Sequence, residues 1–495
     1  MAAHSTPLGE SVPVDASLRG ASLGARVQQL LDARTGEFAV LGLGASGESA
    51  ARLLHAHGIA VYASDHGKSE DVAGAAQRLV QAGIAADAGS HDVARIRRAA
   101  CVVVSPGIPP GVPPLKAAHE AQIPVVSEVE IGLRLLKNTR YIAVTGTNGK
   151  TTTTSLIAHL LRSLGTRVVE AGNIGTPVSE IALEEHPPEW MALELSSFQL
   201  HDTPAVKPTV GVLTNLSPDH LDRYNNDLAA YYADKALMFA NASSPSCWVV
   251  PGEGKDALEM TAQLPGRTLR FSTIRTDVDA YLDRRSGQLV VLGHSIVPRS
   301  DLPLAGDHNV ANLLAALLAV MSAHPSHATS EARGLLANAV SAVKALPHRI
   351  EPVADTGGVL WLNDSKATNV SSTLVAIAGM TRPTVLLLGG RHKGEPYAAL
   401  AGPLLKSGRA VIVYGESAQL IKDDLEPLLA RHVPLHFMPS ASFRSIVEQA
   451  RTLAQPGDAV LLSPACSSYD MFNNYQERGE TFGMLARGEL PAGHP

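Results

Sequence analysis

The run from Gly146 to Thr152 reads GTNGKTT and combines glycines, a lysine and threonine hydroxyls in the order used by phosphate-binding loops. Glycines let backbone N–H groups approach an anion, Lys150 adds positive charge near the β- and γ-phosphates, and a threonine hydroxyl reaches Mg²⁺. The full motif has an earlier glycine where this chain has Val144, so the loop is a shortened variant. We therefore predict an ATP site here.

Three polar residues downstream are candidates for metal binding. Glu194 ends an apolar run, and beside the phosphate loop it would offer the oxygen ligand that Mg²⁺ prefers. The alternative is a glutamate that faces solvent, and the upstream loop favours the metal. His220 follows another apolar run and fits a ligand or a simple cap equally well, whereas Lys235, judged by its residue type alone, is expected to be solvated.

A second glycine-rich turn, GLGASG at Gly42 to Gly47, follows an apolar run and precedes a helical pattern, with Asp65 after the next apolar run. This arrangement is typical of dinucleotide-binding domains and by itself suggests a dehydrogenase. The same turn holds any pyrophosphate, including that of a UDP-sugar. We predict a phosphate site without assigning its cofactor.

Two dense polar segments occur near the C-terminus, at Asn363 to Asn369 and at Ser463 to Ser468, and each follows an apolar run. Two such loops on one domain suggest a binding face. Asp, Ser and Asn also supply ordinary turns, so the residues alone leave both interpretations open.

The elements that position these residues alternate between short apolar runs and stretches of helical length, a pattern typical of parallel α/β sheets. We predict a Rossmann-like first domain, a central P-loop ATPase-type domain and a Rossmann-like third domain. The proposed ranges are a leader over 1–35, expected to be a loose tail with a short helix around Val27 to Leu31, then 36–138, 139–346 and 347–495. Because ligands bind at the carboxyl ends of parallel strands, the polar segments should gather there.

The overall composition excludes several classes of protein. A chain of 495 residues exceeds a single core, and 45% hydrophobic with 18% charged residues indicates a folded protein. A net charge of -6 argues against nucleic acid as a partner. Three cysteines without metal spacing, no apolar run of transmembrane length and no signal peptide predict a cytoplasmic protein without zinc or a membrane span.

Taken in order, several motifs resemble the Mur ligase superfamily: GTNGKTT, GNIG at 172–175, ELSSFQL at 194–200, NLSPDHLDRY at 215–224 and GDHNVANLLAA at 306–316. Three later motifs look like those of members that add D-glutamate: PHRIE at 347–351, NDSKATN at 363–369 and SPACSSYDMFNNYQERG at 463–479. The resemblance runs from about Phe38 to the C-terminus.

This resemblance implies an ATP-dependent amide ligase of peptidoglycan precursor synthesis. Its substrates would be UDP-N-acetylmuramoyl-L-alanine and D-glutamate, joined through an acyl phosphate with two Mg²⁺ ions as cofactors. It also implies a UDP-sugar domain, a central ATPase domain and a C-terminal amino-acid domain that closes over the site, in a protein expected to be a monomer.

The resemblance assigns roles to those residues of this chain that match a motif of the superfamily. The ATP set is Gly146, Thr147, Asn148, Gly149, Lys150, Thr151, Thr152, Asn309, Asn312, Arg349 and Asp364. The UDP-sugar set is Gly44, Ala45, Ser46, Asp65, Gly107, Asn173 and Gln199. The D-glutamate set is Lys366, Thr368, Lys393, Ser468 and Tyr475. The metal set is Thr151, Glu194, His220 and Lys235 as a carbamate, and the catalytic set is Lys150, His220 and Lys235.

Three other functions are weighed against this one. A ligase of the same superfamily could add a different amino acid, but its C-terminal motifs would differ. A NAD(P)-dependent oxidoreductase would rest on GLGASG alone. A regulatory module would bind ATP without forming an amide.

Overall fold

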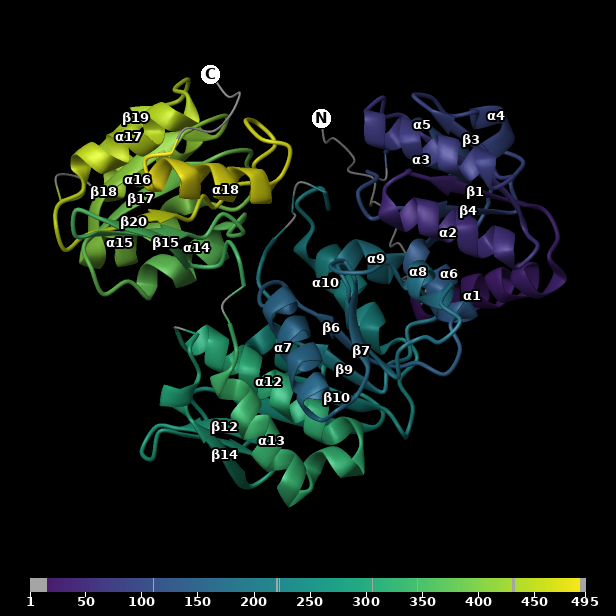
Figure 1. Cartoon of the computed structure of the whole chain (residues 1–495), viewed down its shortest axis with the longest axis horizontal. Helices are drawn as coiled ribbons and strands as arrows, with labels where there is room; N and C mark the ends of the chain where they lie inside the picture. Colours follow the sequence, from purple (N-terminus) through teal and green to yellow (C-terminus); the bar gives the residue numbers. More distant parts are fainter. Residues whose placement is uncertain are drawn as a thin grey trace, which may run out of the picture.

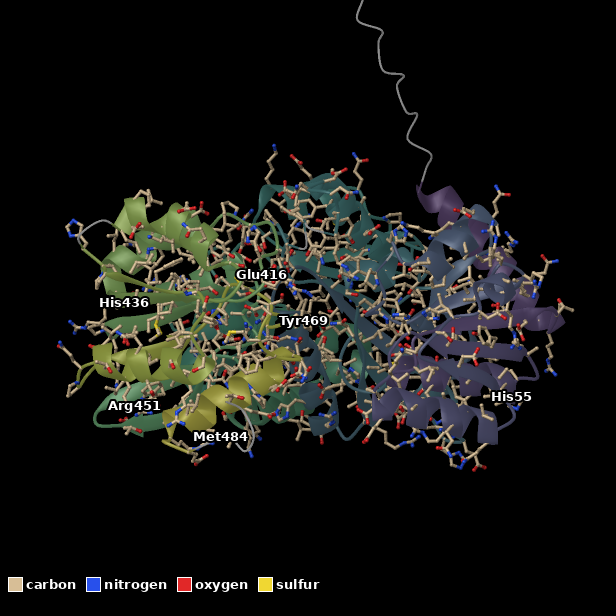
Figure 2. The ribbon with its side chains drawn as sticks, turned by 90° about the horizontal axis from the view of Figure 1, so that it is seen from above. His55, Glu416, His436, Arg451, Tyr469 and Met484 are labelled. Atoms are coloured by element: carbon tan, nitrogen blue, oxygen red, sulfur yellow. The ribbon has the colours of Figure 1, made fainter. Side chains whose placement is uncertain are left out.

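The computed structural model describes residues 16–109, 111–219, 221, 223–304, 306–344, 346–429 and 432–489. Within them the chain forms three α/β domains, coloured purple, teal and yellow-green along the sequence in Figure 1. Seen from above in Figure 2, the teal central part lies between the other two. The predicted fold class is confirmed. None of the helices in these ranges is long and apolar enough to cross a membrane.

The first domain is a five-stranded parallel sheet in the order β3-β2-β1-β4-β5. Its strands are β1 (Glu37–Leu41), β2 (Ala60–Asp65), β3 (Ala85–Ala88), β4 (Cys101–Val104) and β5 (Val125–Ser127). Its helices are α1 (Ala16–Ala33), α2 (Ala45–Ala56), α3 (Glu70–Gln81), α4 (Val93–Ile96), α5 (Pro113–Glu120) and α6 (Glu128–Leu135). Buried apolar side chains line both faces of the sheet, as parallel sheets require.

Over 16–33 the chain forms α1, which includes the short helix predicted around Val27 to Leu31 and is longer than that prediction. Val27 and Leu31, four residues apart on one face, are buried in the core of the first domain. Packing of this face stabilises a helix whose own sequence pattern is weak. The earlier part of the leader lies outside the described residues.

The central domain is a nine-stranded sheet in the order β14-β13-β12-β11-β10-β9-β6-β8-β7. Its strands are β6 (Arg140–Thr145), β7 (Val168–Gly172), β8 (Trp190–Glu194), β9 (Val210–Leu213), β10 (Cys247–Pro251), β11 (Arg267–Ser272), β12 (Ala280–Asp283), β13 (Gln288–Val291) and β14 (His294–Pro298). Two neighbouring pairs, β12–β13 and β13–β14, are antiparallel, and the strands after residue 243 extend the same sheet.

The helices of the central domain cover this sheet. They are α7 (Lys150–Ser163), α8 (Val178–Ala182), α9 (Ser197–His201), α10 (Leu228–Ala236), α11 (Lys255–Met260), α12 (Asp307–Ala323) and α13 (Ser330–Ser341), with 3₁₀ turns η1 (Leu237–Phe239), η2 (Arg299–Asp301) and η3 (Pro325–Ala328). Residues 313–320 of α12 are fully buried, so this helix forms the centre of the largest core and supports α7.

The third domain is a six-stranded sheet in the order β15-β16-β20-β17-β18-β19, parallel except for β15. Its strands are β15 (Glu351–Thr356), β16 (Val359–Asn363), β17 (Thr384–Gly389), β18 (Gly408–Tyr414), β19 (Leu435–Met438) and β20 (Ala459–Leu462). Its helices are α14 (Val370–Ala378), α15 (Ala401–Ser407), α16 (Ala418–Leu429), α17 (Phe443–Leu453) and α18 (Tyr475–Ala486), with the 3₁₀ turn η4 (Tyr397–Leu400).

The carboxyl ends of the third sheet are directed towards the rest of the molecule. In Figure 2, Glu416 and Tyr469, which follow β18 and β20, lie near the middle of the view, whereas His436 and Arg451 lie towards its outer end. His55 of α2 lies at the opposite end. The proposed domain boundaries after 138 and 346 fall in the connections before β6 and β15 and remain a prediction.

Candidate active site

The phosphate loop lies at the carboxyl end of β6, in the middle of the nine-stranded sheet. Val144 of β6 pairs with Glu194 of β8 on one side and with Val212 of β9 on the other. The predicted proximity of Glu194 to the loop is therefore confirmed. The side chain of Glu194 is buried, so the alternative of a solvent-facing glutamate is wrong.

The segment after β9 braces the loop. Asn215 accepts the Asn148 backbone N–H at 3.0 Å and donates to the Asn148 carbonyl at 2.9 Å. The hydroxyl of Thr147 donates to the Ser217 carbonyl at 2.9 Å and accepts the Ser217 N–H at 3.0 Å. These bonds fix the loop before any ligand is bound, which lowers the cost of ordering it around a phosphate.

Two glycines permit the tight path of the loop. Gly149 has φ 79°, and a Cβ there would collide with the Asn312 side chain of α12. Gly146 has φ 142° and approaches the Thr214 hydroxyl too closely for any side chain. Side chains are excluded here by both conformation and space, as phosphate loops require.

Two lysines meet at one backbone carbonyl. Lys150 donates to Gly146 O at 2.9 Å and to Thr147 O at 2.8 Å, and Lys235 donates to the same Gly146 O at 2.7 Å. Burial lowers the pKa of both ammonium groups, and the charge of Lys150 further lowers the pKa of Lys235. The expectation of a solvated Lys235 is wrong, because α10 packs the side chain beneath the loop at 1% exposure.

One oxygen of Glu194 remains available. Oε1 accepts a hydrogen bond from the Asn173 amide at 2.7 Å, while buried Oε2 has no hydrogen-bond partner among the described residues. A buried carboxylate oxygen without a partner is costly unless a cation or donor binds it. This fits a Mg²⁺ ligand, with half-buried Thr151 at the start of α7 as a second candidate.

His220, the predicted metal ligand and catalytic residue, lies outside the described residues. Its neighbour Asp219 is described and buried. No cluster of three or more His, Cys, Asp or Glu side chains suited to a metal occurs in the described ranges. The metal set therefore remains a prediction that rests on Glu194, Thr151 and Lys235.

The nucleotide residues predicted outside the loop come from two domains. Asn312 of α12 accepts a hydrogen bond from Thr153 at 3.3 Å and donates to Asn309 at 3.4 Å, so both lie against α7. Asp364 follows β16, where Ser463 donates to it at 2.7 Å, and burial raises its pKa to about 7. Burial lowers the pKa of Arg349, while the nearby charges of Glu194 and Asp364 raise it.

The predicted D-glutamate residues lie together on the third domain. The Lys366 ammonium lies 3.9 Å from the centroid of the Tyr475 ring, and burial lowers its pKa to about 8. Lys393 donates to the Thr368 hydroxyl at 3.1 Å. Ser468 is buried in the loop after β20 and accepts backbone hydrogen bonds from residues 471 and 472. Two cations on one surface suit a dicarboxylate ligand.

The central and third domains meet at the phosphate loop itself. Asn148 donates to the Ser371 hydroxyl at 2.8 Å and accepts from Ser372 at 2.8 Å. Asn369, which caps the N-terminus of α14, donates to Asp219 at 2.8 Å. This set of polar contacts, called the loop junction below, brings Lys150 near Lys366 and Lys393.

The predicted UDP-sugar residues are divided between the first two domains, and of them only Gln199 lines the cavity between these domains. Gly44 caps α2, and Asp65 accepts the N–H groups of Leu43 at 2.8 Å and Gly67 at 2.7 Å, which shapes the glycine-rich turn. Ala45 and Ser46 form the first turn of α2, and Gly107 is exposed after β4. A cavity of about 230 Å³ separates the ends of β4 and β5 from α9 and includes buried Gln199.

Family models match most of the chain. They are a Mur ligase MurD-like N-terminal domain over residues 36–127, a Mur ligase middle domain over 144–320 and a Mur ligase glutamate ligase domain over 348–466. A UDP-N-acetylmuramoylalanine--D-glutamate ligase of Salinibacter ruber is 38% identical and covers 90% of this chain and 96% of its own. One of Nitrosococcus oceani is 38% identical with the same coverage.

The chain belongs to the Mur ligase family. Solved structures share the fold of this Mur ligase at lower identity. The UDP-N-acetylmuramate-alanine ligase of Thermotoga maritima is 17% identical with a TM-score of 0.59, covering 92% of this chain and all of its own. The folylpolyglutamate synthase of Mycobacterium tuberculosis is 15% identical with a TM-score of 0.55, covering 72% of this chain and 93% of its own.

One residue of this Mur ligase that sequence reasoning missed is Arg478. It is buried on α18 and donates to the Ser365 hydroxyl and carbonyl at 2.9 Å each and to the Cys466 carbonyl at 3.1 Å. It thereby joins the two polar loops that follow β16 and β20. Its position one helical turn after Tyr475 was a usable signal, because such residues share a face.

Proposed function

We propose that this chain is an ATP-dependent amide ligase that adds D-glutamate to UDP-N-acetylmuramoyl-L-alanine in peptidoglycan precursor synthesis, with ADP and phosphate as the other products. The named relatives suggest the substrates. The observation that carries the proposal is the loop junction, which brings the phosphate-loop lysine towards the cations of the third domain. ATP and an acidic amino acid would thus be bound on facing surfaces.

In the proposed first step, the L-alanyl carboxylate attacks the γ-phosphorus of ATP, and ADP leaves. Negative charge is spread over the transferred phosphoryl group, where a positioned cation is most effective. In the structure, the ammonium group of Lys150 donates hydrogen bonds to two carbonyl groups of its own loop. We propose that it turns to the phosphate oxygens when ATP binds.

In the second step the neutral D-glutamate amine attacks the acyl carbon, phosphate leaves with the shared oxygen, and an amide forms as the proton lost by the nitrogen passes to the released phosphate. Lys366 and Lys393 would hold the amino-acid carboxylates, since ammonium groups in a buried setting bind anions strongly. Docking of the third domain through the loop junction would exclude water from the site and so protect an acyl phosphate from hydrolysis.

We propose that Glu194, Thr151, His220 and a carbamate on Lys235 hold Mg²⁺, in two sites. When bound, Mg²⁺ neutralises charge on the phosphate oxygens. The unpartnered oxygen of Glu194 supports this assignment. The lowered pKa of Lys235 supports the carbamate, because only a neutral amine reacts with carbon dioxide.

Two further expectations complete the proposal. The protein is expected to act in the cytoplasm as a monomer. Its three cysteines, Cys101, Cys247 and Cys466, are free and buried, which suits a reducing compartment.

The deciding experiment measures phosphate release from ATP and Mg²⁺ with UDP-N-acetylmuramoyl-L-alanine and a panel of amino acids. Release that requires D-glutamate, with a product heavier by one glutamyl unit, is the expected result. Equal release with L-lysine or diaminopimelate would contradict the substrate assignment. Tight binding of NADH without phosphate release would instead favour the oxidoreductase, and ATP binding without amide formation would favour a regulatory module.

A further inference from the structure

Helix α1 precedes the segment matched by the family model, which begins at residue 36. Val27 and Leu31 bury one face of the helix in the core of the first domain. Arg26 donates to the Gln122 carbonyl at 3.2 Å, which fixes α1 to the end of α5. Figure 1 shows α1, α6 and α8 together where the first domain meets the central domain. The helix is therefore placed to act on this junction.

A continuous chain of polar contacts leads from α1 into the central domain. Gln28 accepts a hydrogen bond from Arg134 Nη1 at 2.8 Å, and Arg134 Nε donates to Glu130 Oε1 at 2.5 Å. The other oxygen, Glu130 Oε2, accepts the Ala205 backbone N–H at 2.7 Å. The side chains of Arg134 and Glu130 are 13% and 0% exposed, so solvent screens this pair weakly.

Gly24 allows α1 to approach this closely. A Cβ at this position would lie 2.8 Å from Arg134 Nη2 and 3.5 Å from Pro204 Cβ. Pro204 belongs to the central domain, so α1 contacts both sides of the junction. A larger residue would displace the Arg134 guanidinium from its present position or move the helix.

The polar contacts from α1 end at Ala205, in the segment 202–205 that directly follows α9. Ser127 donates its N–H to the Asp202 carbonyl at 2.8 Å, and its hydroxyl lies 2.6 Å from that of Thr203. Thr203 donates to the carbonyl of Gln199, one of the residues that line the cavity between the two domains. A shift of residues 202–205 would therefore move Gln199 and the cavity wall.

We propose that α1 is a positioning element for the UDP-sugar substrate: through Gln28, Arg134 and Glu130 it sets the place of residues 202–205, and hence of Gln199, against the first domain. This rests on the proposed function for the identity of the substrate. Arg134 and Glu130 act through neighbouring groups, so they are positioning residues and not catalytic ones.

The test compares Gln28→Ala with Gln28→Glu and with Gln29→Ala, whose side chain is exposed on the same helix. Loss of one hydrogen bond to a buried charge should raise KM for UDP-N-acetylmuramoyl-L-alanine about fivefold. KM for ATP should not change. Both Gln28 variants lose the exposed hydrogen bond that Gln28 donates to Asp32 at 2.9 Å, but Gln28→Glu keeps an acceptor for Arg134. Gln28→Glu should therefore restore KM, while Gln29→Ala should behave as the unaltered chain.

A second measurement does not depend on turnover. Spin labels at Gln81→Cys and Glu331→Cys, both exposed, report the distance between the first and central domains, since the native cysteines are buried. Gln28→Ala should broaden the distance distribution and Gln28→Glu should not. Unchanged KM and distances, or equal effects from Gln29→Ala, would overturn the proposal. If the unaltered chain forms no glutamyl product, the function fails while the distances still decide the role of α1.

Discussion

The two interdomain junctions of this Mur ligase differ in the kinds of side chains that form them. The first and central domains are joined by buried groups: Glu128 accepts the Ser179 N–H at 2.6 Å, and Glu130 accepts that of Ala205. Helices α6 and α8 pack directly against one another. The central and third domains meet through short polar side chains around Asn148 and Asp219.

This difference indicates which junction opens. Separating the first two domains would expose apolar surface and leave buried carboxylates without partners, which is costly. Separating the loop junction exchanges hydrogen bonds between side chains for hydrogen bonds to water, at small net cost. We expect the first two domains to move as one body and the third to open for substrate entry.

The largest expected effect follows from placing the chemistry at the loop junction. Lys150→Ala should lower kcat about a hundredfold to a thousandfold, because it removes a cation from the developing phosphoryl charge. Lys207→Ala, an exposed lysine of the same domain, is the matched control. Phosphate release in the presence of all substrates measures both, and near-normal turnover of Lys150→Ala would contradict the assignment of the loop.

Asn369→Asp should break the loop junction selectively. The new carboxylate keeps the oxygen that caps α14 through Ser372 but faces Asp219, to which Asn369 now donates at 2.8 Å. Repulsion between two buried carboxylates should open the junction and lower kcat/KM about tenfold or more. Small-angle scattering should show a larger radius of gyration. Asn338→Asp, on the surface of α13, should leave both quantities unchanged.

Glu128→Gln tests the buried junction through pH. Burial raises the pKa of Glu128 from 4.5 to about 7. A carboxyl group with a raised folded-state pKa favours folding fully below about pH 4.5, and this contribution is lost as pH rises through 7. Glutamine cannot ionise, so Glu128→Gln should gain roughly 1–3 kcal/mol of unfolding free energy over the unaltered chain between pH 4.5 and 7.5.

Urea unfolding at both pH values measures this gain. Glu184→Gln, an exposed residue near the same junction, should show no such trend. A constant difference between Glu128→Gln and the unaltered chain at both pH values would exclude an ionising group at this position.

The smallest effect is expected from Ser371→Ala. It removes the hydroxyl that accepts from Asn148 at 2.8 Å and donates to Asn369 at 3.2 Å, while Ser372 and Asn369 still hold the Asn148 amide. Turnover should fall only about two- to threefold, since each neutral hydrogen bond contributes about 1 kcal/mol or less and the remaining contacts compensate in part. A loss of turnover as large as that of Asn369→Asp would mean that Ser372 and Asn369 cannot hold the Asn148 amide without Ser371.

The sequence predicts those parts of the site that follow from local sequence patterns and from the geometry of a parallel sheet. Glu194 could be placed beside the phosphate loop because the carboxyl ends of neighbouring parallel strands meet. The bond from Asn369 to Asp219 could not, because it joins residues 150 positions apart on different domains. Burial of Lys235 and the full length of α1 also depend on tertiary packing, which residue type and weak periodicity do not reveal.

The hydrogen bonds of the Asn148 side-chain amide link two of the proposed binding sites. Asn148 belongs to the loop proposed to hold ATP, yet its partners Ser371 and Ser372 belong to the domain proposed to hold D-glutamate. Any ligand that stiffens this amide in its present place also favours the docked third domain. Because coupling between two sites is reciprocal, ATP and D-glutamate should then raise each other's affinity by the same factor.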